Sequence, residues 1–141
     1  MEFAAENTVV DYHAHIRKLR ASVDRFRGRD LGYWSIVETG REDCILGWVM
    51  LIPFNEQDKS FETGWRLAPE VWGHGLGREA ATAILNHAFD RLGARDIWAL
   101  IHPNNTRSLR LAARLGLSDE QSCLRRTHRL FRLSCVFSKT P

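Results

Sequence analysis

Three alternating glycines near the middle of the chain are the residues whose spacing points most directly to chemistry. Gly73, Gly75 and Gly77 stand just after an apolar run and just before a long amphipathic stretch. Glycine permits a positive φ and lets the backbone approach a ligand closely. The first amides of the following helix lack intrahelical acceptors, and the helix dipole adds about half a positive charge there. The pattern indicates a phosphate or pyrophosphate site, while a simple turn is the alternative reading.

Two common phosphate-binding motifs fit this loop poorly. A P-loop ends in Gly-Lys-Ser/Thr, whereas Gly77 is followed by Arg78 and Glu79. A Rossmann fingerprint ends in Gly-x-x-Gly and has an acidic residue about 20 positions later, at the end of a second parallel strand. Here the preceding strand ends in Ala-Pro-Glu at 68–70 and follows an antiparallel hairpin. A different phosphate-binding fold is therefore indicated.

The elements that must position the loop follow from hydrophobic periodicity. Helices are predicted at 12–26, 80–92 and 106–115, and strands at 33–39, 44–52, 61–67, 96–101 and within 131–137. Residues 53–60 are predicted to form a polar loop, and Gly93 is predicted to end the central helix. The fold class is α/β: a mixed, mostly antiparallel central sheet flanked by helices, with a strand–loop–helix–strand crossover at the glycines.

Composition places the chain among globular proteins. Its 141 residues suit a single domain over 1–141, and 44% hydrophobic with 26% charged residues excludes a disordered chain. The net charge of +3 suits an anionic ligand without requiring nucleic acid. Three widely spaced cysteines indicate reduced thiols, and neither a signal peptide nor a membrane span is evident. We expect a cytoplasmic protein.

Two motifs together resemble those of the GNAT-superfamily acetyltransferases. The segment Gly64–Ala80 is similar to their cofactor motif, and most similar to that of the RimJ/RimL-like branch, which includes ribosomal-protein N-terminal acetyltransferases. A second motif, Asn105–Ser108 followed by Arg114–Gly116, matches the family's Asn-x-x-Ser and its later Lys/Arg-Leu-Gly. The resemblance covers roughly Trp34 to Leu117, and the spacing between the motifs is also that of the family.

The resemblance implies an N-acetyltransferase that uses acetyl-CoA without a metal. The backbone amides of 73–78 would hold the coenzyme A pyrophosphate, and a bulge at 65–67 would open a slot for the pantetheine arm. Asn105 would bind that arm, and Ser108 would protonate the departing thiolate; the alternative is a helix cap followed by a first-turn serine. The implied cofactor-binding residues are Trp65, Arg66, Leu67, Trp72, Gly73, His74, Gly75, Leu76, Gly77, Arg78, Asn105 and Ser108.

The reaction also needs a base for the amine. Glu62 is our candidate, because the branch often carries Glu-x-Gly on the strand beside the acetyl group, and Gly64 follows two residues later. Strand alternation puts Glu62, Gly64 and Arg66 on one face. The alternative reading is an exposed strand carboxylate. His102 is a second candidate base, although a turn histidine beside proline is more often structural.

Two departures from the family pattern concern the acid and the N-terminus. Many members carry a tyrosine at the position of Ala112, so Ser108 or water must supply the proton here. Family members usually begin with a strand and a helix before the helix predicted at 12–26. Only Ala4–Val10 is available for that strand, so we expect a shortened N-terminus.

The acceptor stays open. A small-molecule amine or a peptide N-terminus is expected, with no nucleic-acid or membrane partner, and a homodimer is compatible with the sequence. One alternative is an acyl-CoA-binding domain without catalysis. Another is a nucleic-acid-binding module built on the basic residues Arg125, Arg126, His128, Arg129 and Arg132, but the small net charge disfavours it.

Overall fold

The computed structural model describes residues 17, 20–21, 24–26, 30–125 and 128–135. The elements in chain order are β1 Gly32–Glu38, β2 Arg41–Asn55, the 3-10 turn η2 Glu56–Asp58, β3 Ser60–Leu67, the 3-10 turn η3 Pro69–Val71, α3 Leu76–Asp90, β4 Asp96–Ile101, α4 Thr106–Arg114, β5 Ser118–Arg125 and β6 His128–Ser134. The mixed α/β fold predicted from periodicity is confirmed.

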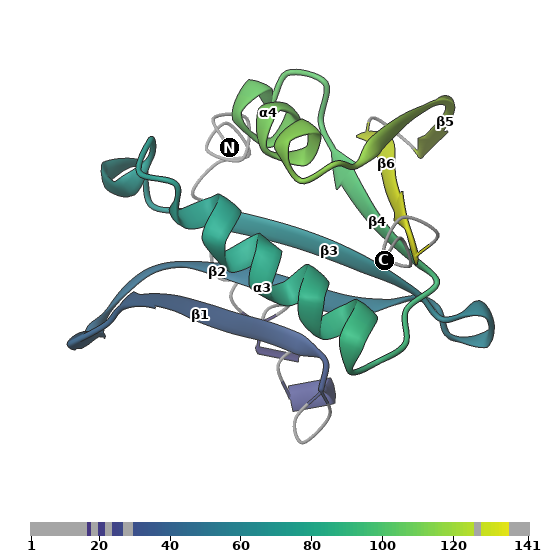
Figure 1. The fold of residues 1–141 in the computed structure, drawn as a ribbon. Helices are drawn as coiled ribbons and strands as arrows, with labels where there is room; N and C mark the ends of the chain where they lie inside the picture. The colour runs from purple at the N-terminus through teal and green to yellow at the C-terminus, as the bar shows by residue number, and fades with distance from the viewer. Residues whose placement is uncertain (1–16, 18–19, 22–23, 27–29, 126–127, 136–141) are drawn as a thin grey trace.

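One six-stranded sheet runs in the order β1-β2-β3-β4-β6-β5 (Figure 1). Every neighbouring pair is antiparallel except β3 and β4, which are parallel. A parallel pair needs a crossover connection, and α3 supplies it. The loop before α3 therefore lies at the carboxyl end of β3, beside the carboxyl end of β4.

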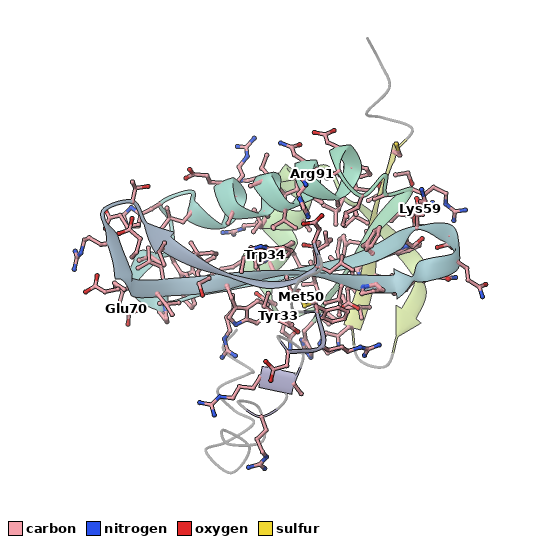
Figure 2. All side chains as sticks on the ribbon, turned by 90° about the horizontal axis from the view of Figure 1, so that it is seen from below. Tyr33, Trp34, Met50, Lys59, Glu70 and Arg91 are labelled. Carbon is pink, nitrogen blue, oxygen red and sulfur yellow. The ribbon has the colours of Figure 1, made fainter. Side chains whose placement is uncertain are left out.

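Helix α3 packs across β2 and β3 and closes the core (Figure 1). The buried residues of α3 repeat at helical spacing. After the helix ends, the chain turns at Gly93, which has a φ of +64°. The sheet alternates as expected: Trp34 faces α3 and contacts His87, while Tyr33 and Met50 lie on the opposite face (Figure 2). The core consists of Val49, Leu51, Ile84, Leu85, Ala88, Ala94, Ile97, Ala99, Ile101, Ala112, Leu117 and Phe131.

The polar loop predicted at 53–60 is shorter than expected. Strand β2 continues through Pro53 to Asn55 and still pairs with β3, for example Pro53 with Phe61. Its pairing with β1 ends at Leu51 opposite Gly32. Beyond Leu51 the β1 side of β2 has no partner strand among the described residues, and proline is tolerated on such an open side. The turn itself is η2, capped by the Asn55 side chain.

The C-terminal part forms a hairpin of two strands, of which only the second is predicted by its apolar alternation. β5 pairs with β6 and lies at the edge of the sheet. Its sequence begins Ser-Asp-Glu-Gln-Ser and has no apolar alternation to reveal it. Ion pairs of Asp119 with Arg129 and of Glu120 with Arg132 join the two strands. Phe137, predicted to continue β6, lies outside the described residues.

The predicted first helix is only partly described. Arg17, Arg20, Ala21, Asp24 and Arg25 are helical, and the rest of 12–26 except Phe26 lies outside the described residues. The strand expected within 4–10 also lies outside them. In the part of the chain that the structure describes, no helix is long and apolar enough to span a membrane.

Asp96 connects three strands at the start of β4. It pairs with Ser60 of β3 and Ser134 of β6, and its Oδ1 accepts a 2.5 Å hydrogen bond from Ser134 Oγ. Arg95 Nε donates to Asp96 Oδ2 at 2.9 Å. Burial raises the pKa of Asp96, but the bonds from Ser134 and Arg95 lower it more, so the pKa lies below its ordinary value.

Candidate active site

The glycine loop and the N-terminus of α3 form one end of the site. Gly75 is the N-cap of α3 with a φ of +76°, and Gly73 has a φ of +83°, a region that disfavours side chains. The first intrahelical bond runs from Glu79 N to Gly75 O. The amides of 76–78 precede it, so they are the unpaired helix donors that bind anions.

Close packing holds this helix end against β3 and α4. A Cβ at Gly77 would lie 3.0 Å from Leu67 Cδ1 and 3.2 Å from Leu111 Cδ2, so only glycine fits without displacement. The Trp72 indole N–H donates to Leu67 O at 3.0 Å and ties the loop to the end of β3. The anion-binding amides are thus held in place by the packing of three elements.

A cavity of about 280 Å³ opens beside these amides. It is lined by the end of β3, the glycine loop and one face of α4. Most predicted cofactor residues line it: Trp65, Arg66, Leu67, Trp72, Gly73, Gly75, Leu76, Gly77, Arg78 and Ser108. His74 is exposed and is not among the lining residues, and Asn105 lines a second cavity instead. We call this space the donor cavity.

Five arginines line the donor cavity, and three of them come from α4. Arg107, Arg110 and Arg114 are spaced by three and four residues, which puts them on one helical face. The Arg107 guanidinium carbon lies 3.9 Å from the centre of the Trp72 ring. These cations suit a ligand with several phosphates. Arg107, Arg110 and Arg114 were not among the predicted cofactor-binding residues, although their spacing within a predicted helix was a signal for a shared basic face.

The slot predicted between β3 and β4 is present, but the predicted bulge is not. β3 and β4 pair only from Ser60 opposite Asp96 to Glu62 opposite Trp98, after which the strands separate (Figure 1). The register of β3 against β2 has no shift across residues 65–67. The separation arises because β4 stays paired with β6 through Ile101 while β3 stays paired with β2 through Leu67.

Trp65 and Ser108 face each other across this separation. Trp65 Nε1 donates to Ser108 Oγ at 3.2 Å, and Ser108 is 7% exposed. Asn105 caps α4, since its Oδ1 accepts from Ser108 N at 3.2 Å. Asn105 is therefore a helix cap, and its amide nitrogen is a donor that this bond does not use. Binding of the pantetheine arm by Asn105 stays a prediction.

A second cavity has a volume of about 190 Å³, and we call it the acceptor cavity. Trp65 and Ser108 line both cavities. The acceptor cavity is lined further by aromatic and aliphatic side chains, by Asn105 and by three titratable side chains: Glu62, His102 and His128. These three come from β3, from the end of β4 and from the start of β6.

The two histidines of the acceptor cavity touch. The ring centres of His102 and His128 are 5.6 Å apart, with the ring planes at 87°. The backbone N–H of Asn104 donates to His102 Nδ1 at 3.1 Å. Burial lowers the pKa of His128 below its ordinary value, and neighbouring His102 lowers it further. His128 was missed as a site residue, because only strand pairing brings it to His102.

Comparison with known proteins agrees with this geometry. Residues 1–118 match the family model described as "Acetyltransferase (GNAT) domain". The chain belongs to the GNAT acetyltransferase family, whose co-substrate is acetyl-CoA. This is the family that the two sequence motifs predict.

One curated relative has a named activity. The chain is 28% identical over 124 residues to FsC-acetyl coenzyme A-N(2)-transacetylase of Aspergillus fumigatus, covering 83% of this chain and 49% of that protein. The chain spans about half the length of the curated relatives it matches.

Solved structures show the same fold. One is the ribosomal-protein-S5-alanine acetyltransferase of Vibrio fischeri, with a TM-score of 0.67, 22% identity and coverage of 84% of this chain and 69% of that one. Another is a mutant form of the spermidine/spermine N-acetyltransferase SpeG of Vibrio cholerae, with a TM-score of 0.67, 16% identity and coverage of 89% and 81%.

Proposed function

We propose that this chain moves an acetyl group from acetyl-CoA directly to a primary amine. The observation that carries the proposal is the meeting of two cavities of different chemistry at the Trp65–Ser108 pair. One cavity is cationic and rich in backbone donors, and the other holds a carboxylate and two imidazoles. A donor and an acceptor bound in them would bring their reacting ends together at the separation of β3 and β4.

The donor cavity fits coenzyme A by its chemistry. The α3 amides of 76–78 are suited to the pyrophosphate, and the α4 arginines Arg107, Arg110 and Arg114 to further phosphate charge. Beyond Glu62 the β4 side of β3 has no strand partner among the described residues, so its backbone groups can hydrogen-bond the amide-bearing arm. When bound there, acetyl-CoA supplies a reactive thioester. Ser108 then lies where a hydroxyl can donate to the leaving sulfur.

The acceptor cavity fits an amine. Among the described residues that line it, Glu62 is the only carboxylate, so it attracts an ammonium group and can take its proton directly or through water. An α-amine with a pKa of about 8 is already roughly 10% neutral at pH 7, whereas a lysine-type amine is far less so. The single carboxylate therefore suits an α-amine, such as a peptide N-terminus, better than a polyamine with several cationic groups.

Membership of the RimJ/RimL-like branch is part of the same proposal. It is supported by the Gly64–Ala80 motif and by the likeness in fold to a ribosomal-protein acetyltransferase. A small-molecule amine is the alternative acceptor, since a spermidine acetyltransferase has the same fold.

The test combines binding with turnover. Acetyl-CoA is titrated by calorimetry, and thiol release is then followed with peptides of varied N-terminal residue, free amino acids and polyamines. Thiol release that depends on a peptide α-amine supports the full proposal. Tight binding without thiol release for any amine would leave an acyl-CoA-binding domain, and no binding would sink the donor assignment.

A further inference from the structure

Met50 of β2 lies directly against Gly64 of β3, and both residues line the acceptor cavity. We propose that the Met50 side chain limits the size of the group that an acceptor carries beside its amine, so that amines with a small substituent are the preferred substrates. The inference rests on the proposed function and adds a specificity-determining residue at the same site.

The contact between the two residues is close because Gly64 has no side chain. Met50 is the antiparallel partner of Gly64 in the β2–β3 register. A Cβ at position 64 would lie 3.0 Å from Met50 Cε, 3.4 Å from Cγ and 3.6 Å from Sδ. The methionine side chain therefore fills the space that a side chain at position 64 would need. Gly64 is not among the glycines with a positive φ, so the room for Met50, and not the backbone conformation, requires glycine here.

The backbone of Met50 is held in place while its side chain lies at the cavity. The hydroxyl of buried Thr63 donates to Met50 O at 3.0 Å, which adds to the pairing of the two strands. Met50 lies on the sheet face opposite α3 (Figure 2), and it is not among the residues that line the donor cavity. A change of this side chain should therefore alter the acceptor cavity and leave the donor cavity intact.

The spacing between Glu62 and Met50 suits a substituent on the acceptor. Glu62 is the carboxylate proposed to attract the ammonium group, and Gly64 follows on the same face of β3, about 6.6 Å further along the strand. Because Met50 lies opposite Gly64, a substituent that extends from the amine along β3 meets the methionine. The cavity of about 190 Å³ is smaller than the roughly 300–1,000 Å³ of most ligand pockets, so it has little room for a bulky group.

Met50 is the more adaptable of the two large apolar side chains that β2 brings to this cavity. The other is Trp48, whose ring contacts Tyr33 edge to face with 5.3 Å between the ring centres. Methionine is unbranched and flexible, and truncating it removes no ring contact. Met50 is therefore the position at which the cavity can be enlarged with the least change elsewhere.

The test is a change in acceptor preference, measured as a ratio of kcat/KM values within each variant. The acceptors differ only in the substituent beside the amine, from hydrogen through methyl and isobutyl to benzyl, in whichever class of amine supports thiol release. The unmodified chain is expected to prefer methyl over benzyl at least about tenfold, and Met50→Ala to lower this preference at least about fivefold, because an apolar pocket discriminates single methylenes by about 10–200-fold. The KM for acetyl-CoA should not change. Met50→Leu, which conserves the volume, should keep the preference of the unmodified chain.

Gly64→Ala tests the same contact from the other strand. Its Cβ would displace the Met50 thioether, so the substitution should alter the preference of the unmodified chain and have little further effect in Met50→Ala. Equal effects of Gly64→Ala in the two backgrounds would contradict the proposed role of the contact.

Ile45→Ala is the matched control, since it truncates a β2 side chain that is 65% exposed and lines neither cavity. A ratio of two acceptors does not depend on how much of a variant is folded, so partial misfolding cannot imitate the result. An unchanged ratio in Met50→Ala, or an equal shift in Ile45→Ala, would overturn the inference. If the unmodified chain releases no thiol with any amine, the proposed function fails and the role of Met50 fails with it.

Discussion

The indole N–H of Trp65 donates a hydrogen bond to Ser108 Oγ at 3.2 Å, joining β3 to α4 where β3 and β4 have separated. Because Oγ accepts from the indole, the serine proton is directed to another partner. We propose that this partner is the leaving sulfur. The bond would also stabilise the charge that develops on Oγ as its proton moves.

Trp65→Phe tests this relationship, since it keeps the ring and removes the N–H. A net hydrogen bond contributes about 1 kcal/mol, so turnover is expected to fall roughly fivefold, with little change in acetyl-CoA affinity. Steady-state kinetics of Trp65→Phe, Ser108→Ala and the double variant check it. In the double variant the loss should equal that of Ser108→Ala alone. Additive losses would show that the two groups act independently.

Glu62→Gln is expected to lower turnover by about 100-fold at pH 7, because general-base catalysis contributes on the order of 10² to 10⁴. The loss should shrink as pH rises toward the pKa of the amine, since the free amine then needs no base. Rates from pH 6.5 to 9 and calorimetry of acetyl-CoA binding measure both effects. Glu38→Gln, at the exposed end of β1, is the control. Equal activity of the two variants would remove Glu62 as base.

Gly75→Val is expected to weaken acetyl-CoA binding at least about tenfold. A Cβ there meets no atom within 4 Å, so the damage comes from the φ of +76° that valine disfavours and from the methyl groups entering the anion site. Gly40 has a φ of +88° and the same open surroundings in the β1–β2 turn. Gly40→Val should lose similar stability and keep its affinity. If calorimetry gave Gly75→Val and Gly40→Val similar affinities for acetyl-CoA, the assignment of the glycine loop to acetyl-CoA binding would be refuted.

Asp96→Asn is expected to lower the free energy of unfolding at pH 7 by about 1–3 kcal/mol, because its bonds to Ser134 and Arg95 are charge-assisted. The folded-state pKa of Asp96 lies below its ordinary value. Its stabilisation is thus complete above pH about 4 and is lost as pH falls through the depressed pKa. Urea unfolding from pH 2.5 to 7 should show the two proteins converging at low pH. Asp90→Asn, which changes an exposed carboxylate of α3, is the control. If the unfolding free energies of Asp96→Asn and the unmodified chain differed by the same amount at every pH, the role given to the Asp96 charge would be contradicted.

Local sequence was enough to predict the elements that have a strong hydrophobic periodicity or a clear turn residue. The stripe of α3, its glycine end and the Asn105 cap were all predictable, because each depends on residues a few positions apart. Strand β5 was not predictable, because its sequence is polar and it is stabilised by pairing with β6 and by ion pairs across the hairpin. The prediction of a bulge at 65–67 was wrong for a similar reason. β3 and β4 separate because β3 stays paired with β2 and β4 stays paired with β6.

The sequence by itself determined the family, and it predicted the glycine loop and the helix that follows it. The residues of the glycine loop and the first turn of α3 are contiguous, so their backbone geometry follows from local residue types. Only the tertiary structure decided which residues share the acceptor cavity. Glu62, His102 and His128 belong to three strands, and their shared cavity depends on the order β3-β4-β6. Strand order is set by long-range pairing and core packing, which no short motif encodes.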